Sequence, residues 1–139
     1  MASRDDYTVG WICALPLEMA AAKAMLDHIH ADLPADPSMN DANAYVLGSL
    51  NGHNVVVACL PFGVYGITSA ATVATQMLAS FKSIRFSLMV GIGGGVPSTK
   101  EDIRLGDIVV SRPTADRPGI IQYDFGRSSR KISLPVQGR

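Results

Sequence analysis

Short runs of apolar and β-branched residues occur at five places along the chain, each of strand length and without helical spacing. We expect strands over Tyr7–Ala14, Tyr45–Leu50, Val55–Leu60, Phe86–Val90 and Leu105–Ser111. Asn51-Gly52 separates the second run from the third and is a strong hairpin signal, so these two strands should be antiparallel neighbours with His53 in the turn. The last two runs are expected to be buried core strands on either side of a glycine bend.

Two longer segments have the apolar spacing of an amphipathic helix. The first should run from Pro16, which suits a first helical turn, to about Ile29. Its apolar positions are Leu15, Met19, Ala22, Leu26 and Ile29. The second should begin with Thr68 or Ser69 as its N-cap. Its apolar positions are Ala70, Val73, Ala74, Met77, Leu78 and Phe81.

Glycines gather where two of the expected strands end, at Gly63 and Gly66 and again over residues 91–95. Glycine lets backbone approach a ligand closely, and N–H groups at a helix start can bind an anion. Taken alone, the second glycine run is as consistent with a structural bend as with a ligand loop. Glu18, in a first helical turn directly after a strand, is favoured there by the helix dipole alone. Together the three features favour one cleft at the end of the sheet.

The charge pattern excludes several kinds of partner. Lys plus Arg and Asp plus Glu both number 12, giving a formal net charge of zero, and no run of like charge occurs. We therefore expect neither a nucleic-acid surface nor a membrane-binding patch. The N-terminus is unlike a signal peptide. Cys13 and Cys59, both inside apolar runs, are expected to be buried reduced thiols, which fits a cytoplasmic protein.

Known nucleotide and metal motifs do not fit this sequence. After Gly91 and Gly93 the dinucleotide fingerprint would need glycine where Val96 stands, and Lys100 is not preceded by glycine as a P-loop requires. His28 and His30, expected two apart at a helix end, would point to different sides. No Cys/His cluster occurs, so we expect no metal and no cofactor.

The chain reads as one incomplete domain. Residues 7–111 carry the expected core, whereas residues 112–139 are rich in Pro, Gly and Ser and are expected to be irregular. Five strands and only two helices do not cover both faces of an α/β sheet. We therefore expect the N-terminal part of a larger domain, with apolar surface exposed over residues 86–96.

Four segments together resemble the superfamily of purine nucleoside and uridine phosphorylases, which includes the methylthioadenosine/S-adenosylhomocysteine nucleosidases. They are Val9–Met19, Gly63–Ala71, Val90–Val96 and Leu105–Ser111. The sequences of residues 14–18 and 91–97 resemble in particular the corresponding segments in the N-terminal regions of fungal multidomain proteins. The resemblance covers residues 9–111.

The resemblance implies a three-layer α/β fold with a central mixed sheet, of which only the N-terminal half is present. It also implies cleavage of an N-glycosidic bond through an oxocarbenium-like sugar, with phosphate as nucleophile in phosphorylases and water in nucleosidases. Glu18 matches the nucleosidase carboxylate that orients the water. Gly63 and Gly66 match the turn beside the phosphate or water site. Gly91 to Gly94 match the strand-end segment that lines the ribose and nucleophile pocket, with Ile92, Gly93 and Gly94 as the expected binding residues.

Departures from the family pattern limit this reading. Met89 stands where phosphorylases place an arginine, and Ile92 stands where they place Ser or Thr, so phosphate binding is doubtful. The segments that bind ribose and protonate the base lie in the second half of the family's domain. We expect a nucleosidase-type or phosphorylase-type domain that binds a nucleoside, is inactive alone and can form a homo-oligomer. A non-catalytic regulatory module and a truncated product are the alternatives.

Overall fold

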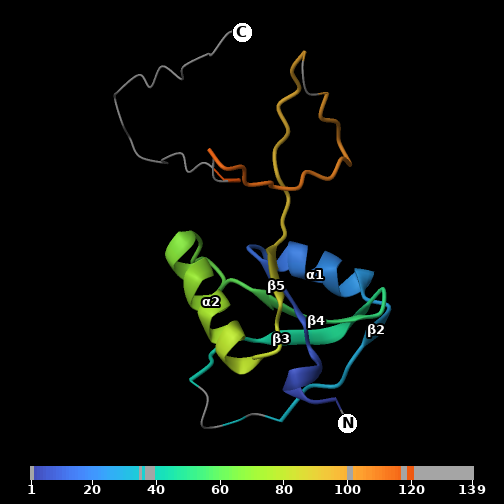
Figure 1. Ribbon diagram of the computed structural model, residues 1–139, viewed down its shortest axis with the longest axis vertical. Coiled ribbons are helices and arrows are strands. Elements are labelled where there is room, and N and C mark those ends of the chain that lie inside the picture. The colour runs from blue at the N-terminus through green and yellow to red at the C-terminus, as the bar shows by residue number, and fades with distance from the viewer. Residues whose placement is uncertain (1, 35, 37–39, 100–101, 117–118, 121–139) are drawn as a thin grey trace. The chain divides into compact units, whose positions relative to one another are not determined.

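The computed structural model describes residues 2–34, 36, 40–99, 102–116 and 119–120, which form two compact units, residues 1–94 and 95–139. We describe each unit by itself. The first contains a short 3-10 helix η1 (Arg4–Asp6), two helices and five strands (Figure 1). These are β1 (Val9–Cys13), α1 (Pro16–Met25), β2 (His28–Ile29), β3 (Tyr45–Leu50), β4 (His53–Cys59), α2 (Ile67–Ser80) and β5 (Phe86–Met89).

The five strands form one mixed sheet in the order β2-β3-β4-β1-β5, with a helix on each face. β1 runs parallel to β4 and to β5, whereas β3 is antiparallel to β2 and β4. Ile12 packs with Val73 and Met77 of α2, and its neighbour Cys13 packs with Ala22 of α1. Successive strand residues point to opposite faces, so α1 and α2 cover different faces. The predicted three-layer α/β architecture is confirmed.

The predicted hairpin is confirmed, and its turn explains its sequence. Asn51 and Gly52 have φ angles of 48° and 79°, the pair of left-handed conformations that a two-residue hairpin turn requires. The expectation that His53 lies in the turn was wrong. His53 begins β4 and pairs with Leu50, although its side chain is exposed.

The first helix is shorter than the apolar spacing predicted. It ends at Met25, and His28–Ile29 form β2 instead of a last helical turn. The N–H of Asp27 donates to the carbonyl of Ser49 at 2.9 Å, and the N–H of His30 donates to that of Leu47 at 2.8 Å. These bonds to β3 replace intrahelical ones. Leu26 packs into the core on the α1 side although it lies after the end of the helix. Its apolar spacing therefore could not show that the helix ends at Met25.

The placement of the two histidines follows from that correction. His28 and His30 lie on a strand and just after it, so the premise that they point to different sides of a helix was wrong. The Nδ1 atom of His30 is 2.8 Å from the hydroxyl oxygen of Tyr7, so this imidazole ring already has a hydrogen-bond partner.

The N-cap of helix α2 lies two residues before Thr68 and three before Ser69, the two predicted caps. Gly66, with φ of 111°, is its N-cap, and no side chain caps the helix. The N–H of Ala70 donates to the carbonyl of Gly66 at 3.0 Å as the first helical bond. A φ in this range is strained for residues with a Cβ, which explains why glycine and neither Thr68 nor Ser69 takes the position.

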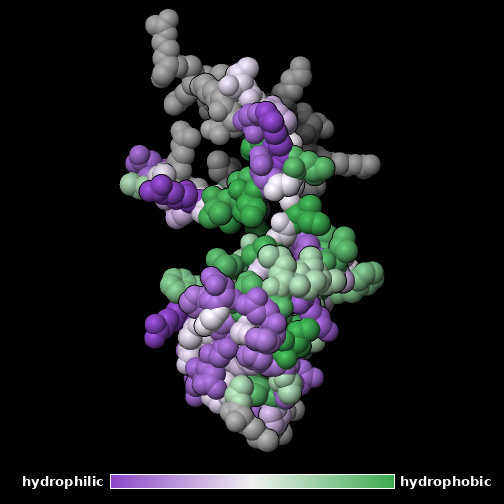
Figure 2. Space-filling model, turned by 90° about the vertical axis from the view of Figure 1, so that its right-hand side faces the viewer, coloured by the Kyte–Doolittle hydropathy of each residue, from purple (hydrophilic) through white to green (hydrophobic). Residues whose placement is uncertain are grey.

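Strand β5 was predicted to be buried, and this was wrong. It forms an edge of the sheet, with all four side chains exposed. The separate expectation of exposed apolar surface from residue 86 onward is confirmed: Phe86 is 66%, Leu88 51%, Met89 58% and Ile92 75% exposed. Hydrophobic side chains reach the surface on the face shown in Figure 2. The prediction failed because, among the described strands, β5 has β1 as its one neighbour.

The second unit contains no strand over Leu105–Ser111 among its described residues, so that prediction was wrong. Leu105 and Gly106 form a turn, with Gly106 at φ of 97°. The side chains of Leu105, Ile108, Val109 and Val110 are between 72% and 106% exposed. A β-rich sequence becomes a strand only when another strand pairs with it. Most of the tail expected to be irregular, residues 121–139, lies outside the described residues.

Both cysteines are free, with Cys13 buried and Cys59 partly buried, which agrees with the predicted reduced thiols. Among the described residues, no helix is long and apolar enough to cross a membrane.

Gly48 gives a direct test of the pairing between β2 and β3. A Cβ added at Gly48 would lie 2.5 Å from the backbone carbonyl oxygen of His28, which cannot move without breaking the pairing. We expect Gly48→Ala to lower the free energy of unfolding by about 2 kcal/mol. Chemical denaturation would measure this, with Ser49→Ala on the same strand as control. Equal stability of the two variants would contradict the register.

Candidate functional site

Glu18 lies in the first turn of α1, directly beyond the carboxyl end of β1, which lies between β4 and β5 in the sheet. Its Oε2 accepts hydrogen bonds from the backbone N–H groups of Ala14 and Leu15, both at 2.9 Å. Its Oε1 accepts one from the N–H of Ile92 at 2.8 Å. The residue is only 8% exposed. The carboxylate therefore joins the end of β1, the start of α1 and the segment after β5.

Three backbone donors determine the charge of this carboxylate. Burial by itself raises the pKa of Glu18, but the hydrogen bonds from Ile92, Leu15 and Ala14 outweigh it and hold the pKa below its ordinary value. Glu18 is therefore ionised at neutral pH. A carboxylate has about four acceptor positions, and the described residues use three of them. One lone pair of Oε1 remains to accept a hydrogen bond from a ligand or a water molecule.

Gly91 makes room for this arrangement. A Cβ at Gly91 would lie 2.7 Å from Oε1 of Glu18 and 3.1 Å from its Cδ. Only glycine lets the strand end approach the carboxylate so closely. Gly91 belongs to the segment, residues 91–94, that the resemblance matched to the ribose and nucleophile pocket, but its contact with Glu18 was not predicted. Its place directly after an apolar strand was the available signal.

The predicted residues after Gly91 differ in what they contribute. Ile92 takes part through its backbone N–H, while its side chain is 75% exposed and donates no hydrogen bond. Gly93 and Gly94 follow Ile92 in the chain, but a Cβ at either would meet no atom within 4 Å. The structure thus brings Glu18 and Ile92 together and gives no contact that would define a role for the two glycines.

Gly63 and Gly66 follow the carboxyl end of β4, at the same end of the strands as Glu18. β4 runs parallel to β1, and the N–H of Leu60, just after β4, donates to the carbonyl of Cys13 at 2.9 Å. The turn that follows leads into α2, whose first N–H groups have no intrahelical partner. A Cβ at Gly63 or Gly66 would meet no atom within 4 Å, so this turn is open. No contact in the structure joins either glycine to Glu18.

Two thiols lie close to the carboxylate. Cys13 and Cys59 are aligned partners on β1 and β4. Burial raises the pKa of Cys13 to about 11, with smaller contributions from Cys59 and Glu18. Burial and the charge of Glu18 also raise the pKa of Cys59. Both are therefore protonated at neutral pH and poor nucleophiles. No three His, Cys, Asp or Glu side chains are grouped like metal ligands within the described part of the chain.

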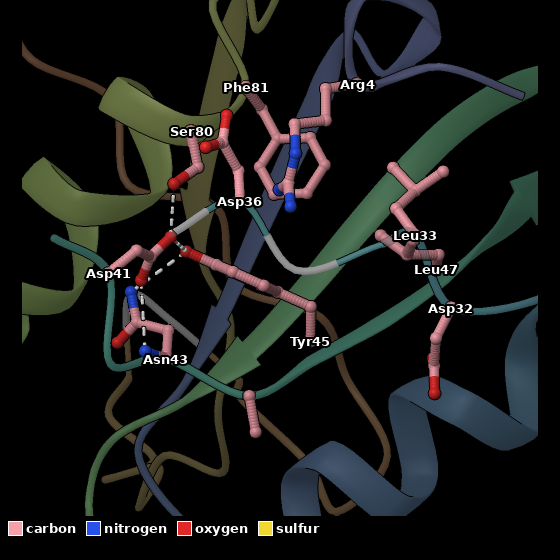
Figure 3. Close-up of a pocket in the computed structure, with 11 residues that line it drawn as sticks. Arg4, Asp32, Leu33, Asp36, Asp41, Asn43, Tyr45, Leu47, Ser80 and Phe81 are labelled. Carbon is pink, nitrogen blue, oxygen red and sulfur yellow. Dashed lines mark hydrogen bonds between the residues drawn. The ribbon is translucent and has the colours of Figure 1, made fainter. Parts of the chain in front are cut away.

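A separate cavity of about 360 Å³ lies on the α2 face, beside η1, the start of β3 and the end of α2 (Figure 3). In it the Asp41 carboxylate accepts hydrogen bonds from the hydroxyls of Tyr45 (2.7 Å) and Ser80 and from the N–H of Asn43 (3.0 Å). Burial opposes ionisation of Asp41, but these bonds, with Ser80 first, hold its pKa below the ordinary value. This cavity was not predicted. Through the hydrogen bond from Ser80, Asp41 connects the loop before β3 to the end of α2.

Comparisons with known proteins agree with the geometry. The family model of the phosphorylase superfamily matches residues 8–136. The chain is 54% identical over 123 residues to a nucleotide-binding leucine-rich repeat (NLR)-like protein of Hyaloscypha variabilis, covering 88% of this chain and 12% of that protein. It is 31% identical over 130 residues to the 5'-methylthioadenosine/S-adenosylhomocysteine nucleosidases of Mycobacterium bovis and Mycobacterium tuberculosis.

The alignments with the nucleosidases cover 94% of this chain but only 44% of each nucleosidase. The chain therefore spans less than half the length of these relatives. No solved structure matches it significantly. The resemblance found in the sequence is confirmed, including its link to a fungal protein, of which this chain matches 12%. With a family model that spans nearly all its residues and the mixed α/β sheet that the family requires, the chain belongs to the phosphorylase superfamily.

Proposed function

We propose that this chain supplies the nucleophile side of a nucleosidase-type site, which hydrolyses the N-glycosidic bond of a nucleoside. The observation that carries the proposal is the Glu18 carboxylate, ionised, nearly buried and held by three backbone N–H groups with one lone pair of Oε1 to spare. Such a group can fix the position of one water molecule. Similarity to two nucleosidases supports the choice of substrate class.

The chemistry asked of Glu18 is limited. As the C1′–N bond breaks, the sugar gains positive charge and the water oxygen bonds to C1′. The water then becomes acidic, and a neighbouring carboxylate can accept its proton. The electron pair of the broken bond leaves with the base, which needs a proton from a second group. We propose no residue of this chain for that second role, because the matching segment belongs to the other half of the family's domain.

Hydrolysis is favoured over phosphorolysis by two side chains. Met89 and Ile92, which stand where phosphorylases place an arginine and a Ser or Thr, carry no group that donates to an anion. The open turn at Gly63 and Gly66 offers backbone N–H groups and the hydroxyls of Thr68 and Ser69 at the start of α2, but residues 60–70 contain no cationic side chain. A phosphate dianion would therefore lack a cationic partner, whereas water needs only an acceptor.

A second candidate function is that of a non-catalytic module, which binds a nucleoside and regulates the larger cytoplasmic protein to which it belongs. The 54% identity to an NLR-like protein, of which this chain matches 12%, supports it. The two functions make different demands on Glu18. A hydrolase needs its charge during turnover, whereas a binding module needs only a hydrogen-bond acceptor.

The test is Glu18→Gln in a protein that contains the complete domain, with nucleoside binding measured by calorimetry and release of free base by chromatography. Asp5→Asn, which removes an exposed carboxylate from η1, is the matched control. We expect base release by wild type and by the control, and a loss of at least about a hundredfold in Glu18→Gln. Equal turnover in Glu18→Gln would remove Glu18 from the mechanism. Binding without any base release in wild type would favour the regulatory module.

A further inference from the structure

The turn between β3 and β4 consists of Asn51 and Gly52, and both residues are exposed. It lies at the amino end of β4, whereas Glu18 lies beyond the carboxyl end of β1, which runs parallel to β4. The turn is therefore at the opposite end of the strands from the candidate site. Its chemistry is independent of the proposed function.

The side-chain amide of Asn51 has a nucleophile next to it in the chain. The backbone nitrogen of Gly52 is the atom with which Cγ of Asn51 can close a five-membered ring. Glycine has no Cβ to obstruct this closure, and nothing lies within 4 Å of the position that a Cβ on Gly52 would occupy. Among the described residues, none accepts a hydrogen bond from the N–H of Gly52. Solvent hydroxide can therefore remove the proton of this N–H.

We propose that Asn51 is a site of spontaneous conversion to aspartate and isoaspartate. The deprotonated Gly52 nitrogen attacks Cγ of Asn51, and the bond from Cγ to the side-chain nitrogen breaks. The leaving nitrogen takes a proton from water and departs as ammonia, so that a succinimide ring joins the two residues. Water then opens the ring. Opening at Cγ gives aspartate, and opening at the backbone carbonyl carbon gives isoaspartate, with the chain running through Cγ.

The new carboxylate would form beside Asp27. The N–H of Asn51 donates to Oδ2 of Asp27 at 2.6 Å, and the N–H of Asp27 donates to the carbonyl of Ser49 at 2.9 Å. These two bonds connect the residue before β2 with β3 and the turn. Either product adds a negative charge next to Asp27, and like charges repel. Isoaspartate also lengthens the backbone of a two-residue turn. Conversion should therefore loosen the pairing of β2 with β3.

The test is incubation of the 139-residue chain in mildly alkaline buffer, followed by peptide mapping. Conversion adds about 1 Da, and electron-transfer fragmentation distinguishes isoaspartate from aspartate. Asn43 and Asn54, which are followed by Ala44 and Val55, are internal controls. We expect Asn51 to convert at least about tenfold faster than either, because the residues after them carry a Cβ. Asn51→Gln keeps the amide but needs a larger ring, so position 51 should stay unconverted.

A synthetic peptide of residues 48–55 shows that the conditions suffice. It should convert faster than the folded chain, in which the pairing of Leu50 with His53 restricts the turn. Conversion of the peptide without any conversion of Asn51 in the chain would overturn the proposal. Equal rates at Asn51 and at the two control asparagines would overturn it as well.

The effect on the sheet is measured on converted chain that ion exchange separates from the unconverted form. We expect isoaspartate at position 51 to lower the midpoint of thermal unfolding by at least about 3 °C. Asn51→Asp, which adds the charge without lengthening the backbone, should show part of this decrease. An unchanged midpoint in the isoaspartate form would contradict the loosening of β2.

Discussion

Replacing Glu18 with Ala should lower the free energy of unfolding at pH 7 by about 3 kcal/mol, since three backbone N–H groups would lose a charged acceptor. The site is nearly closed to solvent, so water can replace the carboxylate only in part. Glu18→Gln should cost less, because its amide oxygen can still accept the bonds from Ala14 and Leu15. Its NH₂ group would then face the N–H of Ile92. Chemical denaturation measures both variants, and a loss below about 0.5 kcal/mol for Glu18→Ala would contradict the hydrogen-bond network.

The stability that Glu18 contributes should depend on pH in a fixed direction. Its pKa in the folded chain lies below the ordinary value of 4.5 for a glutamate side chain. The unfolded chain therefore binds this proton first as pH falls, and the contribution is full above about 4.5 and is lost through the lower folded pKa. The difference between wild type and Glu18→Gln should shrink below pH 4.5. Asp41, with its own lowered pKa, titrates in the same direction in both proteins and cancels from the comparison.

Replacing Gly91 with Ala should disturb the same site from the opposite side. The added Cβ would lie 2.7 Å from Oε1 of Glu18, so either the carboxylate or the strand end must move. We expect a loss of about 2 kcal/mol in the free energy of unfolding. Gly93→Ala is the matched control, because its Cβ would meet no atom within 4 Å. Thermal or chemical denaturation of the two variants gives the comparison.

A double variant makes the prediction sharper. When Glu18 is already Ala, the Cβ at position 91 no longer meets a carboxylate oxygen. The cost of Gly91→Ala should then fall well below its value in wild type, which is the non-additivity expected of two residues in contact. Additive costs would mean that Gly91 is constrained by something other than Glu18.

Local signals in the sequence were enough for some elements of the fold. Asn51 and Gly52 specify a turn by their own conformational preferences, so the hairpin could be predicted without knowing the rest of the sheet. Strand β2 could not be predicted in this way, because His28 and Ile29 are extended only through pairing with β3, about twenty residues further along the chain. The edge position of β5 was equally hidden, since an apolar run does not indicate how many neighbours a strand has.

The candidate site divides in a similar way. Glu18 could be singled out because a carboxylate at the end of a strand and the start of a helix stands out in the sequence. Its partner could not, because the N–H of Ile92 is backbone, lies 74 residues away and leaves no side-chain signal. Gly91 was visible as a glycine after a strand, but only the 2.7 Å approach to Glu18 explains why glycine is needed.

We propose that Glu18 holds the water molecule that attacks the sugar. The most direct test is to incubate the complete domain with purine and pyrimidine nucleosides in ¹⁸O-labelled water, with and without phosphate, and to analyse the sugar product by mass spectrometry. We predict free base and ribose that carries ¹⁸O at C1′, independent of phosphate and lost in Glu18→Gln. Unlabelled ribose 1-phosphate that forms only with phosphate present would contradict the account.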